Sequence, residues 1–133
     1  MIVVNGGSRT QKKYASSMAV YVCNKFGISP DIEINFRRMT KDVNFGYCCH
    51  LDEGEYEIDV KRTLKLRDML MTLAHELVHV KQYEFGELTQ TNEADIDYWD
   101  RPSEIEAHGR EVGLFIRWAE ENYLAHKRCT QTG

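Results

Sequence analysis

The spacing of apolar residues changes along the first half of the chain and predicts a helix followed by a strand. Over residues 10–26, apolar side chains recur at helical spacing, and Gly27 follows directly as a typical terminator. From Ile32 as far as residue 37, apolar and polar residues alternate, which is typical of a half-buried strand. We therefore expect one helix and then the start of a sheet.

Two further strands are predicted by the next two segments. Residues 43–51 and residues 56–62 are rich in aromatic and β-branched side chains. The loop between them, residues 52–55, contains Gly54, and a short glycine-containing loop between two such segments is typical of a hairpin. The sequence therefore predicts three strands in all.

Two helices are predicted in the second half of the chain, separated by a polar, irregular segment. The first covers residues 66–85 and ends before Gly86. Its apolar surface consists of Leu66, Leu70, Leu73, Ala74, Leu77 and Val78. The last helix covers residues 101–124, with Pro102 in its first turn and Ser103 as a candidate cap. Its expected inward-facing residues are Ile105, Val112, Phe115, Ile116 and Ala119.

This order of elements predicts an α+β fold in a single domain over residues 1–133. Hydrophobic residues make up 42% of the chain and charged residues 29%, which is enough apolar material for one core. We expect a three-stranded antiparallel or mixed sheet packed against the helices.

Charge and composition narrow the class of partner. Lys and Arg total 17 against 21 for Asp and Glu, so the net charge is −4, and we expect no general affinity for nucleic acids. No apolar run is long enough for a signal peptide or a membrane span. The four cysteines show no paired spacing, so reduced thiols in a cytoplasmic protein are expected.

The predicted helix over residues 66–85 carries a His-Glu-x-x-His motif. His75 and His79 are four residues apart, so on a helix they project from the same face and can both bind one Zn²⁺. Glu76 lies about 100° around the helix axis, where it can take a proton from a zinc-bound water as that water attacks a peptide carbonyl. The alternative, a pair of core histidines, would need hydrogen-bond partners for each buried polar group.

A catalytic zinc usually has three protein ligands and one open position, so a third ligand is expected from later in the chain. The candidates by residue type are Glu104, Glu106, His108, Glu111 and His126. By composition alone, a solvated, acidic helix start is the better explanation for most of these residues, since acidic residues favour the N-terminal end of a helix dipole.

Two motifs together resemble the gluzincins, zinc peptidases whose third ligand is a glutamate on a later helix. "HELVH" is followed by "EIEAH", which begins 25 residues after the second histidine. The family's glutamate helix reads Glu-x-x-Ala/Ser/Gly-Asp, so the resemblance implies Glu104 as third ligand and Ala107 as the small residue between two close helices. In the family the following aspartate hydrogen-bonds a ligand histidine. Here His108 stands at that position and departs from the pattern.

The size and order of elements resemble the minimal domains called minigluzincins, a small zincin-like fold. The resemblance covers residues 10–124 in element order, but specific residues match only in the two helical motifs. If His108 were the third ligand, the protein would be more similar to SprT-type metalloproteases, which use three histidines.

The resemblance also implies an extended peptide or protein substrate that pairs with the last strand before the motif helix. Residues 44–51 are the candidate edge strand, because Gly46 weakens this segment as an interior strand. A donor for the developing oxyanion is needed as well. The sequence offers Tyr98, Arg101, His108 and Tyr123.

The sequence therefore predicts a zinc-dependent metallopeptidase with Zn²⁺ as cofactor, His75, His79 and Glu104 as ligands and Glu76 as general base. One rival is a binding or regulatory module that keeps the zinc fold without turnover, although Glu76 argues against a dead enzyme. A second rival is a purely structural zinc, but such sites tend to be closed and rich in cysteine.

Overall fold

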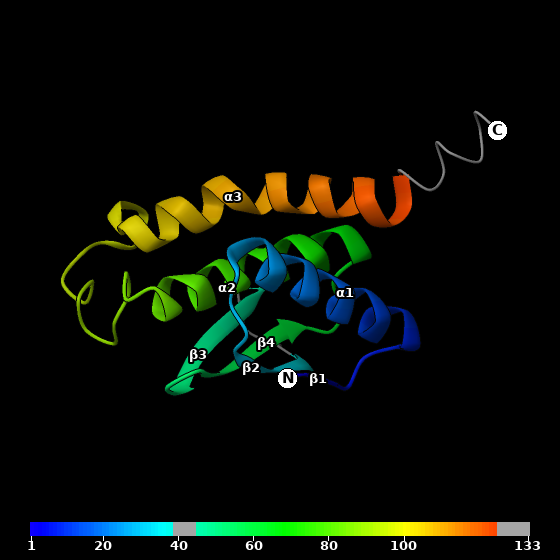
Figure 1. Cartoon of the computed structure of the whole chain (residues 1–133), viewed down its shortest axis with the longest axis horizontal. Helices are drawn as coiled ribbons and strands as arrows, with labels where there is room; N and C mark the ends of the chain where they lie inside the picture. Colours follow the sequence, from blue (N-terminus) through cyan, green and yellow to red (C-terminus); the bar gives the residue numbers. More distant parts are fainter. Residues whose placement is uncertain (39–44, 125–133) are drawn as a thin grey trace.

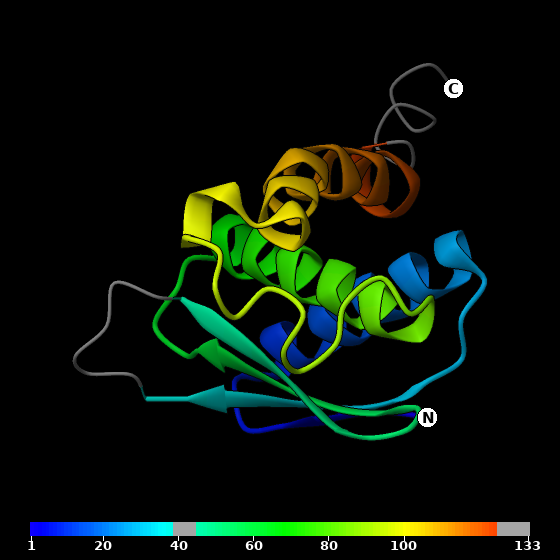
Figure 2. The same ribbon diagram turned by 90° about the vertical axis from the view of Figure 1, so that its left-hand side faces the viewer.

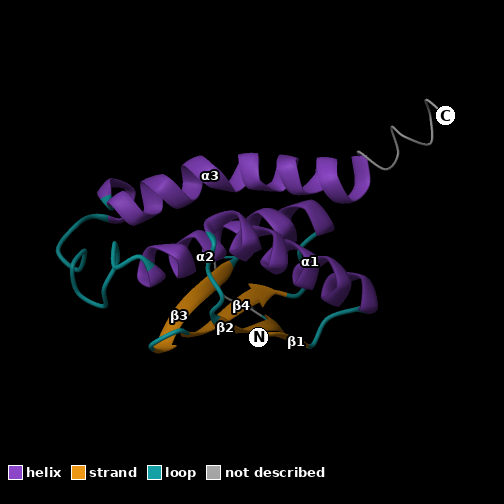
Figure 3. Ribbon diagram, viewed as in Figure 1, coloured by secondary structure: helices purple, strands orange, loops and turns teal. Residues whose placement is uncertain are grey.

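The computed structural model describes residues 1–38 and 45–124, in which a sheet, two helices and a third helix form successive layers (Figures 1 and 2). The strands are β1 (Ile2–Asn5), β2 (Asp31–Arg37), β3 (Gly46–Asp52) and β4 (Glu55–Lys61). The helices are α1 (Arg9–Phe26), α2 (Leu66–Glu84) and α3 (Pro102–Ala119), with a 3₁₀ turn at Tyr98–Asp100 and a π-helical turn at Glu120–Leu124. Figure 3 separates these helices from the strands by colour.

The sheet is mixed and has the strand order β1-β2-β4-β3. β1 and β4 are both parallel to β2, whereas β3 and β4 are antiparallel and form the predicted hairpin, with Gly54 in the left-handed region at φ 72°. The α+β class is therefore confirmed, but three strands were expected and the sheet has four. The missed strand, β1, is too short for alternation to be recognised, and its partner β2 lies more than 25 residues away in sequence.

The core lies between one face of the sheet and the helices α1 and α2. Along β2 and β4 the residues that point inward are fully or nearly buried: Ile32, Ile34, Phe36, Tyr56, Ile58 and Val60. α1 begins with a capping box, because the Ser8 side chain accepts from the backbone N–H of Gln11 while the Gln11 side chain accepts from the backbone N–H of Ser8. Gly27, at φ 68°, ends the helix as predicted.

α2 is the central helix, covered by the sheet on one side and by α3 on the other. Its predicted apolar surface is buried from Leu70 to Val78, except that Leu66 at the first turn is 41% exposed. Because α2 is enclosed on both sides, its polar residues in the middle, including His75 and His79, are buried too. No helix of the described residues is both long and apolar enough to cross a membrane.

The inward face predicted for α3 is wrong for three of its five residues, whereas Ala119 is buried as predicted and Phe115 packs against the core. Ile105, Val112 and Ile116 are 59%, 43% and 46% exposed. The residues that α3 buries at helical spacing are Ala107, Leu114, Trp118 and Ala119. Glu104 and Glu111 lie on the same row of the helix as Ala107 and Leu114, so the side that faces α2 is polar in its first half and apolar in its second. The prediction counted apolar residues alone and therefore selected Ile105, Val112 and Ile116, which lie on the side of α3 opposite to Ala107 and Leu114.

The start of α3 also differs from the prediction. Arg101 occupies the N-cap position without a capping side chain, and Ser103 lies inside the first turn. Glu93 provides the missing acceptor, since its carboxylate accepts a 3.0 Å hydrogen bond from the backbone N–H of Ser103 and another from the Ser103 hydroxyl. This contact ties the segment before α3 to the end of the helix that carries Glu104.

Candidate metal centre

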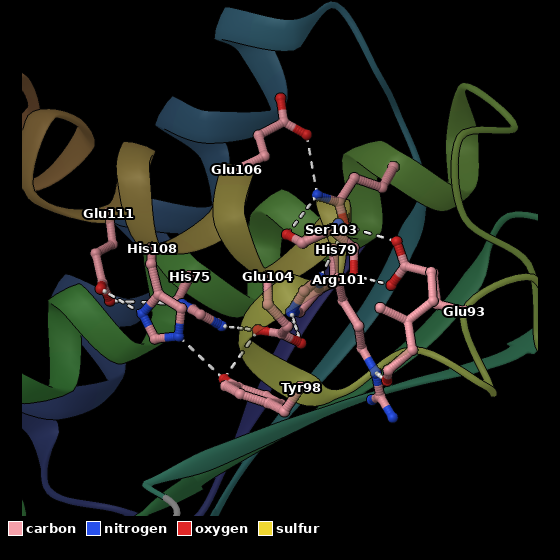
Figure 4. A network of polar contacts seen from close by, with 12 residues as sticks. His75, His79, Glu93, Tyr98, Arg101, Ser103, Glu104, Glu106, His108 and Glu111 are labelled. Atoms are coloured by element: carbon pink, nitrogen blue, oxygen red, sulfur yellow. Dashed lines mark hydrogen bonds and ion pairs between the residues drawn. The ribbon is translucent and has the colours of Figure 1, made fainter.

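Three side chains from two helices converge between α2 and α3. His75 and His79 lie one turn apart on α2, and Glu104 lies in the first turn of α3. Nε2 of His75 lies 3.0 Å from Oε1 of Glu104, and Nε2 of His79 lies 3.1 Å from Oε2 (Figure 4). One ligand atom from each of the three residues lies within 4.8 Å of the others. The structure thus brings together the three residues predicted as zinc ligands.

The proton on His79 can be assigned from its surroundings. Nδ1 of His79 lies 2.8 Å from Oε1 of Gln82, and Nε2 of Gln82 donates to the carbonyl of Ser103 and to Glu106, at 2.9 Å each. Both of those partners only accept, which fixes the orientation of the Gln82 amide. The Gln82 oxygen must therefore accept from Nδ1–H of His79. In the neutral imidazole this leaves the Nε2 lone pair directed at the cluster, as a metal ligand requires.

His75 has a comparable partner on its other ring nitrogen. Its Nδ1 lies 3.5 Å from Oε2 of Glu111, whose Oε1 lies 3.1 Å from Nδ1 of His108. Glu111 thus stands where a carboxylate can orient His75, the role that the resemblance gives to an aspartate at the position of His108. Glu111 was considered in the sequence only as a ligand.

Without a metal, protons on the two histidines balance the negative charge of the nearby carboxylates. Burial by itself lowers the pKa of His75, but hydrogen bonds to Glu104 and Glu111 outweigh burial and raise the pKa to about 10. The pKa of His79 is raised for the same reason, through Glu104. Burial raises the pKa of Glu104, but the two histidines lower it well below its usual range. A divalent cation can replace these protons, so the donor set of two imidazoles and one carboxylate fits Zn²⁺.

Glu76, the acidic side chain of the motif, differs from His75 and His79 in its contacts with the residues that the structure describes. It is 8% exposed, and its carboxylate forms no hydrogen bond or ion pair with any described residue. Burial raises the pKa of Glu76; the nearby histidines lower it, and Glu104 and Glu111 raise it again. A bound cation would lower it in turn. Glu76 lines the pockets on both sides of the cluster, so its carboxylate is accessible to a substrate or a water.

Tyr98 and His108 lie beside the cluster and do not replace any of its three members. The Tyr98 hydroxyl lies 3.0 Å from Oε1 of Glu104 and 3.0 Å from Nε2 of His108. His108 forms a second group of close ligand atoms with His75 and Glu111, but no group within the described residues joins it to both motif histidines. The geometry therefore favours Glu104 over His108 as third ligand.

The remaining candidates lie elsewhere. Glu106 points away from the histidines and bonds to Lys81, Gln82 and Arg110 (Figure 4). Burial raises its pKa, but these three partners outweigh burial and lower it to about 2. His126 and the side chain of Tyr123 lie outside the described residues.

Gln82 is a site residue that the sequence analysis missed. Its signal was its position three residues after His79, since side chains at this spacing are neighbours on one helix face. Gln82 also follows Val78 of the predicted apolar surface by four residues, which was a further indication, because a buried amide needs partners for all its hydrogen-bonding groups.

The cluster opens into two connected pockets of about 480 and 580 Å³. Gly46, His75, Glu76 and Tyr98 line both of them. β3 forms one wall, and in the strand order of the described residues it stands at the end of the sheet. From Gly46 onward, the candidate edge strand predicted over residues 44–51 is therefore an edge strand among the described strands.

Comparisons with protein-family models, curated proteins and solved structures find no match to this chain. The resemblance to the gluzincins therefore remains a prediction that depends on the two helical motifs.

Proposed function

We propose that this protein is a zinc-dependent metallopeptidase that hydrolyses peptide bonds of an extended substrate. The observation that carries the proposal is the arrangement of four residues. Nε2 of His75 and of His79 lie about 3 Å from the two oxygens of Glu104, and the unpartnered carboxylate of Glu76 lies beside them. Two imidazoles and a carboxylate beside an open pocket are the donors of a catalytic rather than a closed, structural zinc site.

Each residue has a distinct role in this proposal. When bound, zinc supplies a Lewis acid that polarises the peptide carbonyl and lowers the pKa of water. His75, His79 and Glu104 hold the ion, while Gln82 and Glu111 orient the two imidazoles. Glu76 takes a proton from the attacking water as the new carbon–oxygen bond forms. It then gives that proton to the amide nitrogen as the carbon–nitrogen bond breaks.

Tyr98 is the proposed donor to the oxyanion. Its hydroxyl is held 3.0 Å from a Glu104 oxygen and so lies next to the ligand cluster without being needed as a ligand. A phenol at this place can donate to the carbonyl oxygen of the substrate as negative charge develops there. Arg101, a second candidate, lines one pocket only, and its Nε donates to the Ile96 carbonyl at 2.8 Å.

The proposed substrate backbone adds to the edge of the sheet along β3. Backbone hydrogen bonds along an edge strand bind any extended peptide, and side-chain pockets then determine preference. Gly46 supports this geometry, because a Cβ there would lie 2.8 Å from Cγ2 of Thr72 and 3.0 Å from the carbonyl oxygen of Asp59. A glycine therefore lets β3 approach α2 next to Glu76.

The test separates metal binding from turnover. Purified protein is loaded with zinc, its metal content is measured, and cleavage of a peptide library is followed by mass spectrometry. We expect one Zn²⁺ per chain, lost in Glu104→Ala. We also expect Glu76→Gln to keep zinc and folding while hydrolysis falls by roughly 10²–10⁴-fold.

Two results would change the assignment. Full zinc content in Glu104→Ala together with its loss in His108→Ala would favour a three-histidine site of the SprT type. Stoichiometric zinc without cleavage of any library peptide, in wild type and Glu76→Gln alike, would favour the non-catalytic module. Glu120→Gln is a matched control, since Glu120 lies just past the end of the same helix and pairs with Arg117 instead of the histidines.

A further inference from the structure

We infer that the pocket on the Arg101 side of the cluster binds a carboxylate of the substrate. This inference rests on the proposed function and specifies its substrate class. Among the residues that the structure describes, Arg101 is the only lysine or arginine that lines the two pockets at His75, Glu76 and Tyr98. A guanidinium presents a rigid pair of donors that matches a carboxylate, so its placement beside the metal ligands is a basis for recognition.

The Arg101 side chain is held in place, yet the ends of its guanidinium are free. Its Nε donates to the carbonyl of Ile96 at 2.8 Å, and no described residue accepts from its two terminal nitrogens. Glu93, Asp97 and Asp100 lie within eight residues of Arg101 in the sequence, but none of these described residues forms an ion pair with it. Glu93, which lines the same pocket, bonds to Ser103 instead.

A half-buried arginine without an anionic partner is uncommon beside so many carboxylates. Figure 4 shows Arg101 and Glu93 on the same side of the cluster, with the guanidinium extending away from the Glu93 carboxylate. Asp97 and Asp100 lie close to Arg101 in the sequence, but neither of these described residues forms an ion pair with the guanidinium. The charge of Arg101 is therefore left for a group that enters the pocket.

The same pocket is bounded at its far end by the segment between α2 and α3. Leu88, Thr89, Gln90 and Ala94 from this segment line the pocket, and Nε2 of Gln90 donates to the carbonyl of His50 on β3 at 3.3 Å. Figure 2 shows this segment lying beside α2 and reaching toward β3. This contact lies two residues along β3 from Cys48, the last β3 residue that lines the pocket. It therefore limits the path of a peptide along β3, which favours the carboxylate of a chain terminus over that of an internal side chain.

The experiment uses probes that bind zinc and carry the carboxylate at a variable distance. The monohydroxamates of succinic, glutaric and adipic acid are each compared with the corresponding primary amide, which has the same length and no charge. Binding to zinc-loaded protein is measured by calorimetry, which needs no turnover. We expect at least one acid to bind wild type roughly tenfold or more tightly than its amide. We expect this ratio to fall to about one in Arg101→Gln.

The amide forms of the probes report on the metal site alone, because they bind zinc but carry no carboxylate. If they bind wild type and Arg101→Gln equally, the zinc site is intact and only carboxylate recognition is lost, as we expect. Arg9→Gln, which removes an exposed charge at the start of α1, should keep the full preference. If Arg101→Gln binds no probe, Arg101→Lys decides in its place: a preference for an acid supports the inference, and equal affinities overturn it.

Failure of the inference and failure of the proposed function give different results. Amides and acids that bind wild type equally well at all three lengths would overturn the role of Arg101 and leave the metal site standing. Probes that do not bind at all would contradict the metal site and the inference with it. Cleavage of a neutral peptide with a free C-terminus, but not its amidated form, would identify the terminal carboxylate. Cleavage of amidated peptides that contain Glu, but not of the same peptides with Gln in its place, would identify a side-chain carboxylate as the group that Arg101 binds.

Discussion

Replacing Gln82 by methionine is expected to weaken zinc binding although Gln82 is not itself a ligand. Gln82 is 1% exposed, so no water can take the place of its amide oxygen at Nδ1 of His79. Methionine has a similar length and no strong acceptor. In the metal-free variant the imidazole can move its proton to Nε2 and donate it to Glu104, which lies 3.1 Å away. Zinc binding then forces the proton back to Nδ1, where it has no partner.

The size of the effect follows from this difference between the two states. A buried donor without an acceptor costs about 1–3 kcal/mol. At about 1.4 kcal/mol per factor of ten, the zinc affinity should fall by roughly 5- to 150-fold. The two hydrogen bonds from Nε2 of Gln82, to Ser103 and Glu106, are lost with and without metal, so they lower the stability of the fold but cancel in the affinity.

The affinity is measured by competition with a chromophoric zinc chelator, and thermal unfolding in excess chelator reports the stability separately. Gln90→Met is the matched control, since the Gln90 amide bonds the His50 carbonyl rather than a histidine ring. Its zinc affinity should equal that of wild type. A Gln82→Met affinity within twofold of wild type would refute the reasoning that Gln82 selects the tautomer of His79.

Two further outcomes are expected. Gly46→Ala should lower the free energy of unfolding in urea by about 1–3 kcal/mol, because its Cβ meets Thr72 and the Asp59 backbone, whereas Gly109→Ala, with open space around it, should not destabilise the protein. Zinc binding at pH 7 should release at least one proton and weaken as the pH falls, since the pKa of His75 is about 10 in the metal-free protein and the pKa of His79 is raised as well. Calorimetry in two buffers of different ionisation enthalpy measures the release. Because this pKa is raised above that of the unfolded chain, the stability that His75 confers on the metal-free protein is complete below about pH 6.5. It should be lost as the pH rises toward 10.

The sequence predicted those parts of the fold that depend on local pattern. The bounds of α1, α2 and the β3–β4 hairpin were predicted within one or two residues, because caps, glycines and periodicity mark the ends of these elements. The exception is the start of the strand predicted from residue 43, since residues 43 and 44 lie outside the described residues. β1 was missed because its existence depends on pairing with β2, a contact between distant parts of the chain. No local pattern of four residues records such a partner.

The site was predictable where its spacing follows helix geometry and not where it depends on how α3 is rotated about its axis. His75, Glu76 and His79 follow from one helix alone. The buried face of α3 was assigned to its larger apolar residues, yet Ile105 and Ile116 are exposed, and the small Ala107 is fully buried against α2. A row that mixes Glu104, Ala107 and Glu111 with apolar residues cannot be recognised as buried until its polar partners on α2 are known.

The distribution of partners also differs between the proposed zinc ligands and the proposed general base. His79 is held at Nδ1 by Gln82, His75 lies beside Glu111, and Glu104 contacts both imidazoles and the Tyr98 hydroxyl. Gln82 and Glu111 contact the ring nitrogens that do not face Glu104, whereas Tyr98 contacts Oε1 of Glu104, the same oxygen that faces His75. Glu76 is buried to the same degree but has no such restraint within the described residues. A carboxylate that accepts and then delivers a proton must reach water and substrate, and Glu76 lines both pockets beside the cluster. This position supports the proposed role of Glu76 as general base.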